Sequence, residues 1–167
     1  MSMVFAPFCE PDVPSPPPAR NVPQEEPRPP LRLIAFADGA SRGNPGPAFY
    51  GAVIYDLQHQ ELRASGDAIG RDTNNVAEYR GAIAAVQGAL DLGATELELN
   101  MDSQLIVRQV EGSYRVKNAK LRPLFLRLQA LLNQLDAFKI QHVPREQNTR
   151  ADALANAALD GRLTGVE

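Results

Sequence analysis

The sequence predicts a mixed α/β domain with a five-stranded sheet, whose first three strands are antiparallel and whose helices pack on the sheet. Three short strand-like segments separated by turn residues fill residues 31–69. From residue 75 the apolar spacing changes to the three- and four-residue steps of an amphipathic helix. Strand-like and helix-like segments then alternate, which gives the order βββαβααβα and a sheet of mixed direction.

The first part of the chain is predicted to form a meander of three strands. Residues 31–38 (LRLIAFAD) are short, apolar and followed at once by Gly39, as in a buried strand that runs into a turn. Residues 43–47 (GNPGP) force a loop. A short hairpin connection is expected at Gln58 and His59. The three strands are predicted over residues 31–38, 48–57 and 60–69.

The second part of the chain is predicted to be mainly helical. From Asn75 to Leu90 apolar residues recur at helical spacing, and Gly93 closes the segment. Residues 95–101 (TELELNM) alternate like a strand. The remaining elements are expected to be two helices, a last strand and an alanine-rich last helix, over residues 103–111, 121–135, 137–143 and 149–160 respectively.

The composition divides the chain into a tail and one folded domain. Ten of the 14 prolines lie in residues 1–30, where they fix φ and remove backbone donors. We therefore predict a disordered, proline-rich tail over residues 1–30. The length of the remainder suits a single core, so we place the folded domain at residues 31–162 and a flexible C-terminus at residues 163–167.

Composition also limits the location and the partners. Residues 1–8 lack the basic start and apolar run of a signal peptide, and Cys9 has no partner for an intrachain disulfide. We expect a cytoplasmic protein without a membrane partner. The net charge is −3, but the tail holds four of the 20 acids and two of the 17 bases, which leaves 16 acids and 15 bases. If four of those acids bind divalent cations, the surface is mildly positive and a nucleic-acid partner remains compatible.

Four acidic residues lie at the ends of predicted elements. Asp38 ends the first strand, Asp102 follows the fourth, and Glu78 and Asp152 lie in the first turns of two helices. If the two strands are neighbours, their terminal carboxylates lie within reach of one ion, and a cation offsets their repulsion. Four hard oxygen donors suit Mg²⁺ or Mn²⁺.

Each acid also has a simpler explanation. Asp102 and Asp152 suit the positive end of a helix dipole. Asn75 with Glu78, and Thr149 with Asp152, have the spacing of capping boxes. Asp38 with Gly39 could form a turn. The spacing alone leaves both interpretations open.

Four motifs together resemble type 1 ribonuclease H over residues 31–160. They are DGASRGNPGP at residues 38–47, TNNVAE at residues 73–78, MDSQ at residues 101–104 and NTRAD at residues 148–152. The resemblance implies that Asp38, Glu78, Asp102 and Asp152 are catalytic carboxylates that bind two Mg²⁺ or Mn²⁺ ions. It further implies hydrolysis of the RNA strand of RNA–DNA hybrids, with 5′-phosphate and 3′-hydroxyl products.

The same resemblance, with the capacity of amides to read 2′-hydroxyl groups, gives a set of candidate substrate contacts. Turn and cap chemistry is the alternative for the amides. The candidates are Gly39, Ser41, Arg42, Asn44, Thr73, Asn74, Asn75, Gln104 and Asn148.

The sequence departs from the family pattern in two places. His142 lies ten residues before Asp152, where many bacterial relatives have a loop histidine that aids product release, but its context is typical of a strand end. Arg145 is the alternative for that role, although it could merely contact phosphate. Residues 112–120 are too short for the extra helix and basic loop of some relatives. A smaller basic cluster beside Tyr114 contains Arg115, Lys117, Lys120 and Arg122.

Two other functions stay open at this level. One is a related nuclease of the same superfamily that acts on DNA, and the other is a nucleic-acid-binding module that has lost catalysis. The asparagine-rich motif before Glu78 favours cleavage of hybrids, and the presence of all four acids argues against the second alternative. We expect a monomer with no obligate protein partner.

Overall fold

A computed structural model describes residues 29–160 of the chain. The predicted tail, apart from Pro29 and Pro30, and the predicted C-terminal segment lie outside the described residues. The elements are β1 (Arg32–Ser41), β2 (Gly46–Tyr55), β3 (Glu61–Asp72), α1 (Asn74–Asp91), β4 (Glu96–Met101), α2 (Gln104–Glu111), α3 (Arg122–Leu132), β5 (Ala137–His142), a short 3₁₀ turn (Arg145–Gln147) and α4 (Thr149–Leu159).

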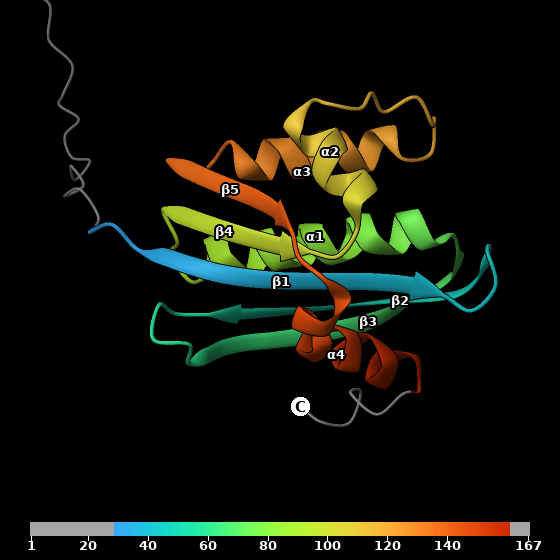
Figure 1. Ribbon diagram of the computed structural model, residues 1–167, viewed down its shortest axis with the longest axis horizontal. Coiled ribbons are helices and arrows are strands. Elements are labelled where there is room, and N and C mark those ends of the chain that lie inside the picture. Colours follow the sequence, from blue (N-terminus) through green and yellow to red (C-terminus); the bar gives the residue numbers. More distant parts are fainter. Residues whose placement is uncertain (1–28, 161–167) are drawn as a thin grey trace, which may run out of the picture.

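The five strands form one mixed sheet in the order β3-β2-β1-β4-β5 (Figure 1). β1 pairs antiparallel with β2 and parallel with β4, while β2 and β3 are antiparallel and β4 and β5 are parallel. The predicted mixed sheet and the order βββαβααβα are confirmed. β1 is therefore the central strand, with hydrogen bonds to a neighbour on each side.

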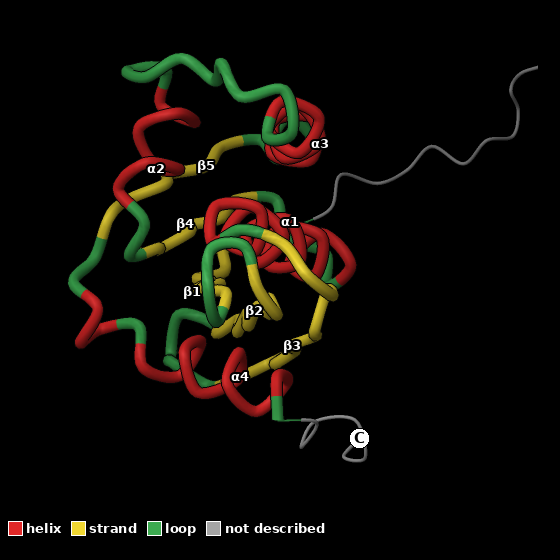
Figure 2. The backbone as a smooth tube through the Cα atoms, turned by 90° about the vertical axis from the view of Figure 1, so that its right-hand side faces the viewer, coloured by secondary structure: helices red, strands yellow, loops and turns green. Residues whose placement is uncertain are grey.

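The helices cover the two faces of the sheet unequally (Figure 2). α1 packs on β1 and β2, and α2 and α3 lie on the same side, where they enclose the main hydrophobic core. α4 packs on the opposite face, against β1, β2 and β3. A smaller cluster of Val53, Ala151 and Leu154 fills that contact. Within the described residues, no helix is long and apolar enough to cross a membrane.

Three glycines let helix and strand backbones meet without side chains between them. A Cβ atom at Gly39 of β1 would lie 2.3 Å from the carbonyl carbon of Ala77 in α1. From the other side, a Cβ at Gly81 would lie 2.6 Å from the carbonyl oxygen of Asp38. On the opposite face, a Cβ at Gly51 of β2 would lie 2.3 Å from the carbonyl oxygen of Ala151 in α4. Both helices consequently sit directly on the centre of the sheet.

Two of the three strands on the antiparallel side, β1 and β3, are longer than the sequence predicts. β1 continues past Asp38 to Ser41, because its pairing with β2 continues to Ser41 opposite Ala48. Its parallel pairing with β4 ends at Ala37 opposite Met101. Asp38 is therefore not the last residue of the strand but the first one beyond the parallel pairing. β3 likewise runs to Asp72, beyond its predicted end at residue 69, because it stays paired with β2.

The helix starts also correct the prediction. Thr73 is the N-cap of α1, and its Oγ1 accepts a hydrogen bond from the Val76 amide at 3.2 Å. Glu78 consequently lies in the second turn, not the first as predicted, and the alternative explanation of Asn75 and Glu78 as a capping box does not apply. At α4 the N-cap is Asn148, which makes no side-chain cap, so the alternative explanation of Thr149 and Asp152 as a capping box does not apply either.

The close approach of α1 to β1 leads to a stability prediction. We expect Gly81→Ala to lower the free energy of unfolding by about 1–3 kcal/mol, because its Cβ meets backbone that cannot move aside. The melting temperature should fall by several degrees in differential scanning calorimetry. Gly88→Ala in the same helix is the control, since its Cβ meets only the ends of the Ile54 and Arg63 side chains. The prediction would be contradicted if Gly81→Ala raised the melting temperature as much as Gly88→Ala.

Candidate active site

Three of the four predicted acids come together beyond the end of the parallel pairing. Asp38, Glu78 and Asp102 each offer a carboxylate oxygen, and these oxygens all lie within 4.8 Å of one another. Asp38 is only 7% exposed, and the other two side chains are partly buried. They lie in an open pocket of about 560 Å³, the acid pocket, together with Gly39, Ala40, Asn74, His142, Pro144 and Arg145.

Local structure explains why these three side chains meet. Asp38 follows the last residue of β1 that pairs with the parallel strand β4. Glu78 lies near Asp38 because α1 packs directly on the backbone of Gly39. Asp102 follows β4 directly, next to β1 in the sheet. Ser103 then caps α2, since its Oγ accepts from the Ile106 amide at 3.3 Å. The buried Tyr79 hydroxyl donates to Gln109 Oε1 at 2.6 Å and so fixes α2 against α1.

Asp152 approaches from the opposite face of the sheet. It lies in the first turn of α4, and after burial and the charge of Asp102 its carboxyl is a further cause of the raised pKa of Asp38. It does not belong to the group of three oxygens within 4.8 Å. Its Oδ1 lies 3.9 Å from Nη2 of the exposed Arg145. Asp152 therefore lies beside the cluster of three acids, with its carboxylate directed towards the positively charged guanidinium of Arg145.

Crowding and burial change the proton affinity of two of these acids. Burial, followed by the charge of Asp102, raises the pKa of Asp38 to about 8, although the Gly39 amide opposes this by donating to its carboxylate at 2.8 Å. Burial also raises the pKa of Glu78 to about 7, with a hydrogen bond from Ser103 acting in the opposite direction. The site resists the accumulation of negative charge when no cation is present.

Asn148 links α4 to the central strand. Its side chain is 1% exposed, and its Nδ2 donates to the carbonyl oxygen of Ala37 at 2.9 Å. Ala37 immediately precedes Asp38, so this bond sets the position of the start of α4 relative to the acid cluster. The structure thus places Asn148 inside the protein, in contact with β1.

Several other predicted substrate residues tie the β1–β2 loop to α1. Asn74 Oδ1 accepts from the Ser41 amide at 2.7 Å, and the Asn74 amide donates to Asn44 Oδ1 at 3.1 Å. The Ser41 hydroxyl also donates to the carbonyl oxygen of Gly43. Arg42 Nη2 lies 3.8 Å from Asp160. The loop is consequently held at the rim of the acid pocket.

A second hollow, the asparagine pocket, lies at the start of α1 and has a volume of about 170 Å³. Asn44, Thr73 and Asn75 of the predicted set lie here, with Val76, Asn118, Lys120 and Leu121. Lys120 pairs with Asp72 at 2.8 Å, which holds the short loop after α2 against the end of β3. The basic cluster suggested Lys120 from the sequence, but nothing there indicated Asn118. Gln104 is the exposed first residue of α2.

The two candidates for product release both lie in the acid pocket. His142 is the last residue of β5, as its sequence context predicts, and is exposed. Arg145 begins the 3₁₀ turn and is the residue that approaches Asp152. Ser103 is a site residue that we did not predict, although its position after Asp102 and before a helix was a usable signal.

The donor set fits a hard divalent cation. All of the clustered atoms are carboxylate oxygens, as Mg²⁺ and Mn²⁺ prefer. Burial, together with the charge of Asp102, raises the pKa of Asp38 and of Glu78, and a bound cation would favour the charged form of both carboxylates. The residues present therefore fit the ions that the sequence suggested.

The pKa shifts predict how stability depends on pH in the absence of metal. Because the folded chain holds the Asp38 proton up to about pH 8 and an unfolded aspartate loses it near pH 3.8, the free energy of unfolding should fall as pH rises between those values. Asp38→Asn should flatten this decline and raise the melting temperature at pH 8 by roughly 5 °C in EDTA. Thermal melts from pH 5 to 9 measure both effects, and parallel curves for the two proteins would refute the pKa shift.

Comparisons with known proteins agree with this geometry. A protein-family profile described as "Reverse transcriptase-like" matches residues 36–158. The crystal structure of ribonuclease H1 from Halobacterium salinarum superimposes with a TM-score of 0.76 and 48% identity, covering 78% of this chain and 98% of that one. The structure of LC11-RNase H1 in complex with an RNA/DNA hybrid gives 0.74 and 41%, covering 79% of this chain and 99% of that one.

Curated relatives share the same segment. A bifunctional protein of Mycobacterium tuberculosis is 50% identical over 131 residues, which are 78% of this chain but 36% of that protein. The halobacterial ribonuclease HI is 48% identical over 77% of this chain and 65% of its own length. The chain thus spans only part of these relatives. A ribonuclease H of Halorhodospira halophila, by contrast, is 36% identical and covered over 91% of its length. This chain belongs to the type 1 ribonuclease H family.

Proposed function

We propose that the protein is a metal-dependent endonuclease that hydrolyses the RNA strand of RNA–DNA hybrids and leaves 5′-phosphate and 3′-hydroxyl ends. The observation that carries the proposal is the set of three carboxylates within 4.8 Å in an open pocket. Several relatives are named ribonuclease H, and one of them, LC11-RNase H1, has been solved in complex with an RNA/DNA hybrid. The fold and this pocket together support hydrolysis of a nucleic-acid backbone.

The same proposal assigns the acids as metal ligands. Asp38, Glu78 and Asp102 would hold Mg²⁺ or Mn²⁺, and Asp152 would join them from α4 once its carboxylate leaves Arg145. Two ions held by these carboxylates would supply Lewis-acid chemistry, namely activation of a water molecule and stabilisation of the departing 3′ oxygen. The chain itself then needs no nucleophile, and within the acid pocket it offers neither a serine nor a cysteine.

The residues of the chain would orient the substrate around those ligands. Asn44, Asn75 and Gln104 carry amides, which both donate to and accept from a 2′-hydroxyl group. The backbone of the loop from Gly39 to Gly43 joins them, and it begins in the acid pocket with Gly39 and is held at Ser41 by Asn74. These residues would bind the RNA strand, while Thr73 at the asparagine pocket and its neighbour Asn74 would lie near the DNA strand.

Release of the product is assigned to the exposed side of the pocket. Arg145 can pair either with Asp152 or with a phosphate group, because its guanidinium is exposed and only 3.9 Å from the carboxylate. His142 is the other candidate and lines the same pocket. We further expect a cytoplasmic monomer that needs no protein partner.

Two alternatives remain distinguishable from this function. A related nuclease that acts on DNA would use similar acids, so the nature of the preferred duplex decides between them. A binding module without catalysis would be expected to lack one of the four acids, and this chain has them all. We favour hybrid cleavage because relatives of similar length are named ribonuclease H.

A cleavage assay tests the proposed substrate. With Mg²⁺ or Mn²⁺, the protein should cut the labelled RNA strand of a hybrid and leave single-stranded RNA largely intact, because the site reads an RNA strand paired in a duplex. Gel electrophoresis of 5′-labelled RNA gives both the rate and the end chemistry. Equal cutting of double-stranded DNA would instead assign the protein to the DNA-cutting alternative.

A substitution tests the metal site. Asp102→Asn should abolish cleavage and weaken the binding of Mn²⁺ measured by calorimetry, while the melting temperature stays equal or rises, since one repulsive charge is lost. Asp136→Asn is the matched control, because Asp136 is exposed just before β5, at the opposite end of that strand from the site. Full activity of the Asp102 variant would remove this residue from the metal site.

A further inference from the structure

A groove between α1 and α3 lies outside the candidate active site. This α1–α3 groove has a volume of about 390 Å³. Tyr50 of β2 forms one wall, Arg80, Ala84 and Gln87 of α1 form another, and Leu124 and Arg127 of α3 form the third. None of these residues belongs to the predicted set of site residues.

The α1–α3 groove carries two positive charges that form no direct ion pair, although Arg80 also interacts electrostatically with Asp72. Arg80 and Arg127 are both exposed, and no acidic side chain lines the groove. Among the residues that the structure describes, no carboxylate lies within ion-pair distance of either guanidinium. A guanidinium group binds phosphate through two parallel hydrogen bonds, so two unpaired groups on facing helices suit a chain of phosphates.

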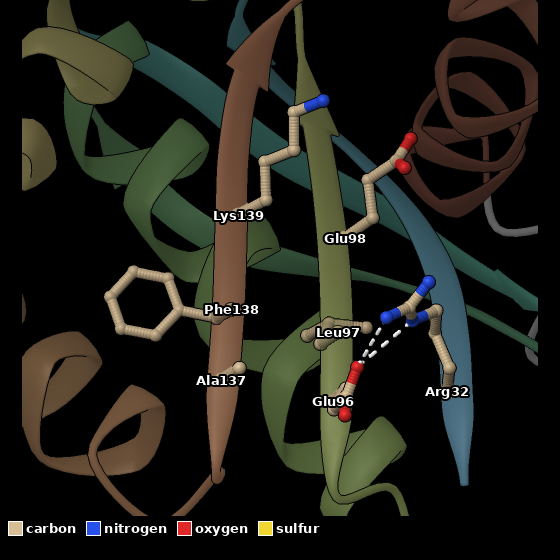
Figure 3. A pocket seen from close by; sticks show the side chains of 7 residues that line it. All are labelled: Arg32, Glu96, Leu97, Glu98, Ala137, Phe138 and Lys139. Atoms are coloured by element: carbon tan, nitrogen blue, oxygen red, sulfur yellow. Dashed lines mark hydrogen bonds and ion pairs between the residues drawn. The ribbon is translucent and has the colours of Figure 1, made fainter.

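Another pocket of this protein provides a contrast. A hollow of about 290 Å³ on the β1–β4–β5 part of the sheet also contains two cations, Arg32 and Lys139 (Figure 3). There, however, Arg32 pairs with Glu96 at 2.6 Å, and Glu98 also lines the hollow. The two positive and two negative side chains of this hollow cancel in net charge, so it does not attract an anion electrostatically. Of these two hollows, the α1–α3 groove is the one without an acidic lining residue.

The groove continues the asparagine pocket along the same side of α1. Val76 lines the asparagine pocket, while Arg80, Ala84 and Gln87 line the groove. These positions are 4, 8 and 11 residues after Val76 and form one stripe along the helix. The stripe is about 16 Å long, or roughly five base pairs of a duplex. On α3, Leu121 and Leu124 connect the two hollows in the same way.

We propose that the α1–α3 groove binds backbone phosphates of the substrate duplex beyond the asparagine pocket, with Arg80 and Arg127 as the phosphate ligands. This inference rests on the proposed function. The Tyr50 hydroxyl and the Gln87 amide are additional donors for the same phosphates. Recognition of this kind is independent of base sequence and lengthens the contact between protein and duplex.

The experiment compares Arg80→Ala, Arg127→Ala and the double variant with the wild-type protein on a hybrid of roughly 20 base pairs. Each single substitution should raise KM about 3–10-fold and leave kcat within about twofold, because the lost contact is remote from the acids. The slope of log KM against log salt concentration should become shallower by about one for each residue. Arg80→Lys keeps the charge and should keep most of that slope.

Lys139→Ala is the matched control, since it removes one positive charge from the balanced hollow and should change neither KM nor the slope beyond twofold or so. On a hybrid of roughly six base pairs, too short to reach from the acid pocket along the groove, the arginine variants should match the wild type. The inference would be overturned if the arginine variants had the same KM values and slopes as Lys139→Ala on the long hybrid, or if their KM rose as much on the short hybrid as on the long one.

Absence of cleavage by the wild-type protein would instead refute the proposed function. In that case, anisotropy with the labelled hybrid would still decide whether the arginine variants lose binding relative to Lys139→Ala.

Discussion

Direct contact between backbones at the centre of the sheet is the constraint on which the candidate site depends. Gly39 and Gly81 bring α1 against β1, and Gly51, which pairs with Asp38 across the hairpin, brings α4 against β2 from the other face. Side chains at these places would separate the layers by the thickness of at least one methyl group. Glu78 and Asp152 would then no longer reach the level of Asp38, and the acids would remain scattered over separate elements.

Bringing several carboxyl groups close together has an electrostatic cost that the fold tolerates. Asp38 is buried beside Asp102 and Asp152, and its raised pKa expresses the work of placing another negative charge there. The protein offsets part of this cost locally, through the Gly39 amide at Asp38, the Ser103 side chain at Glu78 and the Arg145 guanidinium at Asp152. The offset remains incomplete, which leaves the cluster with a strong preference for a cation over an apolar or anionic ligand.

Periodicity in the sequence was sufficient for the element types, their order and the mixed sheet, because each amphipathic segment must bury one side. The ends of the elements were less predictable, since they depend on pairing with neighbouring strands. β1 and β3 extend beyond their predicted ends because both stay paired with β2. The four acids could be selected because their spacing and motifs coincide, whereas the inward orientation of Asn148 depends on an oxygen of Ala37, 111 residues away. The α1–α3 groove has no motif at all, because Arg80 and Arg127 meet only through helix packing.

The position of α4 at the end of the described chain has a consequence for biosynthesis. Three of the acids lie on elements that precede residue 103, but Asp152 and the Asn148 bond to Ala37 arrive with the last helix. During vectorial synthesis the ribosome releases the early strands and α1 well before α4 can dock. A nascent chain can therefore form most of the sheet before Asp152 arrives, so the arrangement of four acids is completed only when α4 docks.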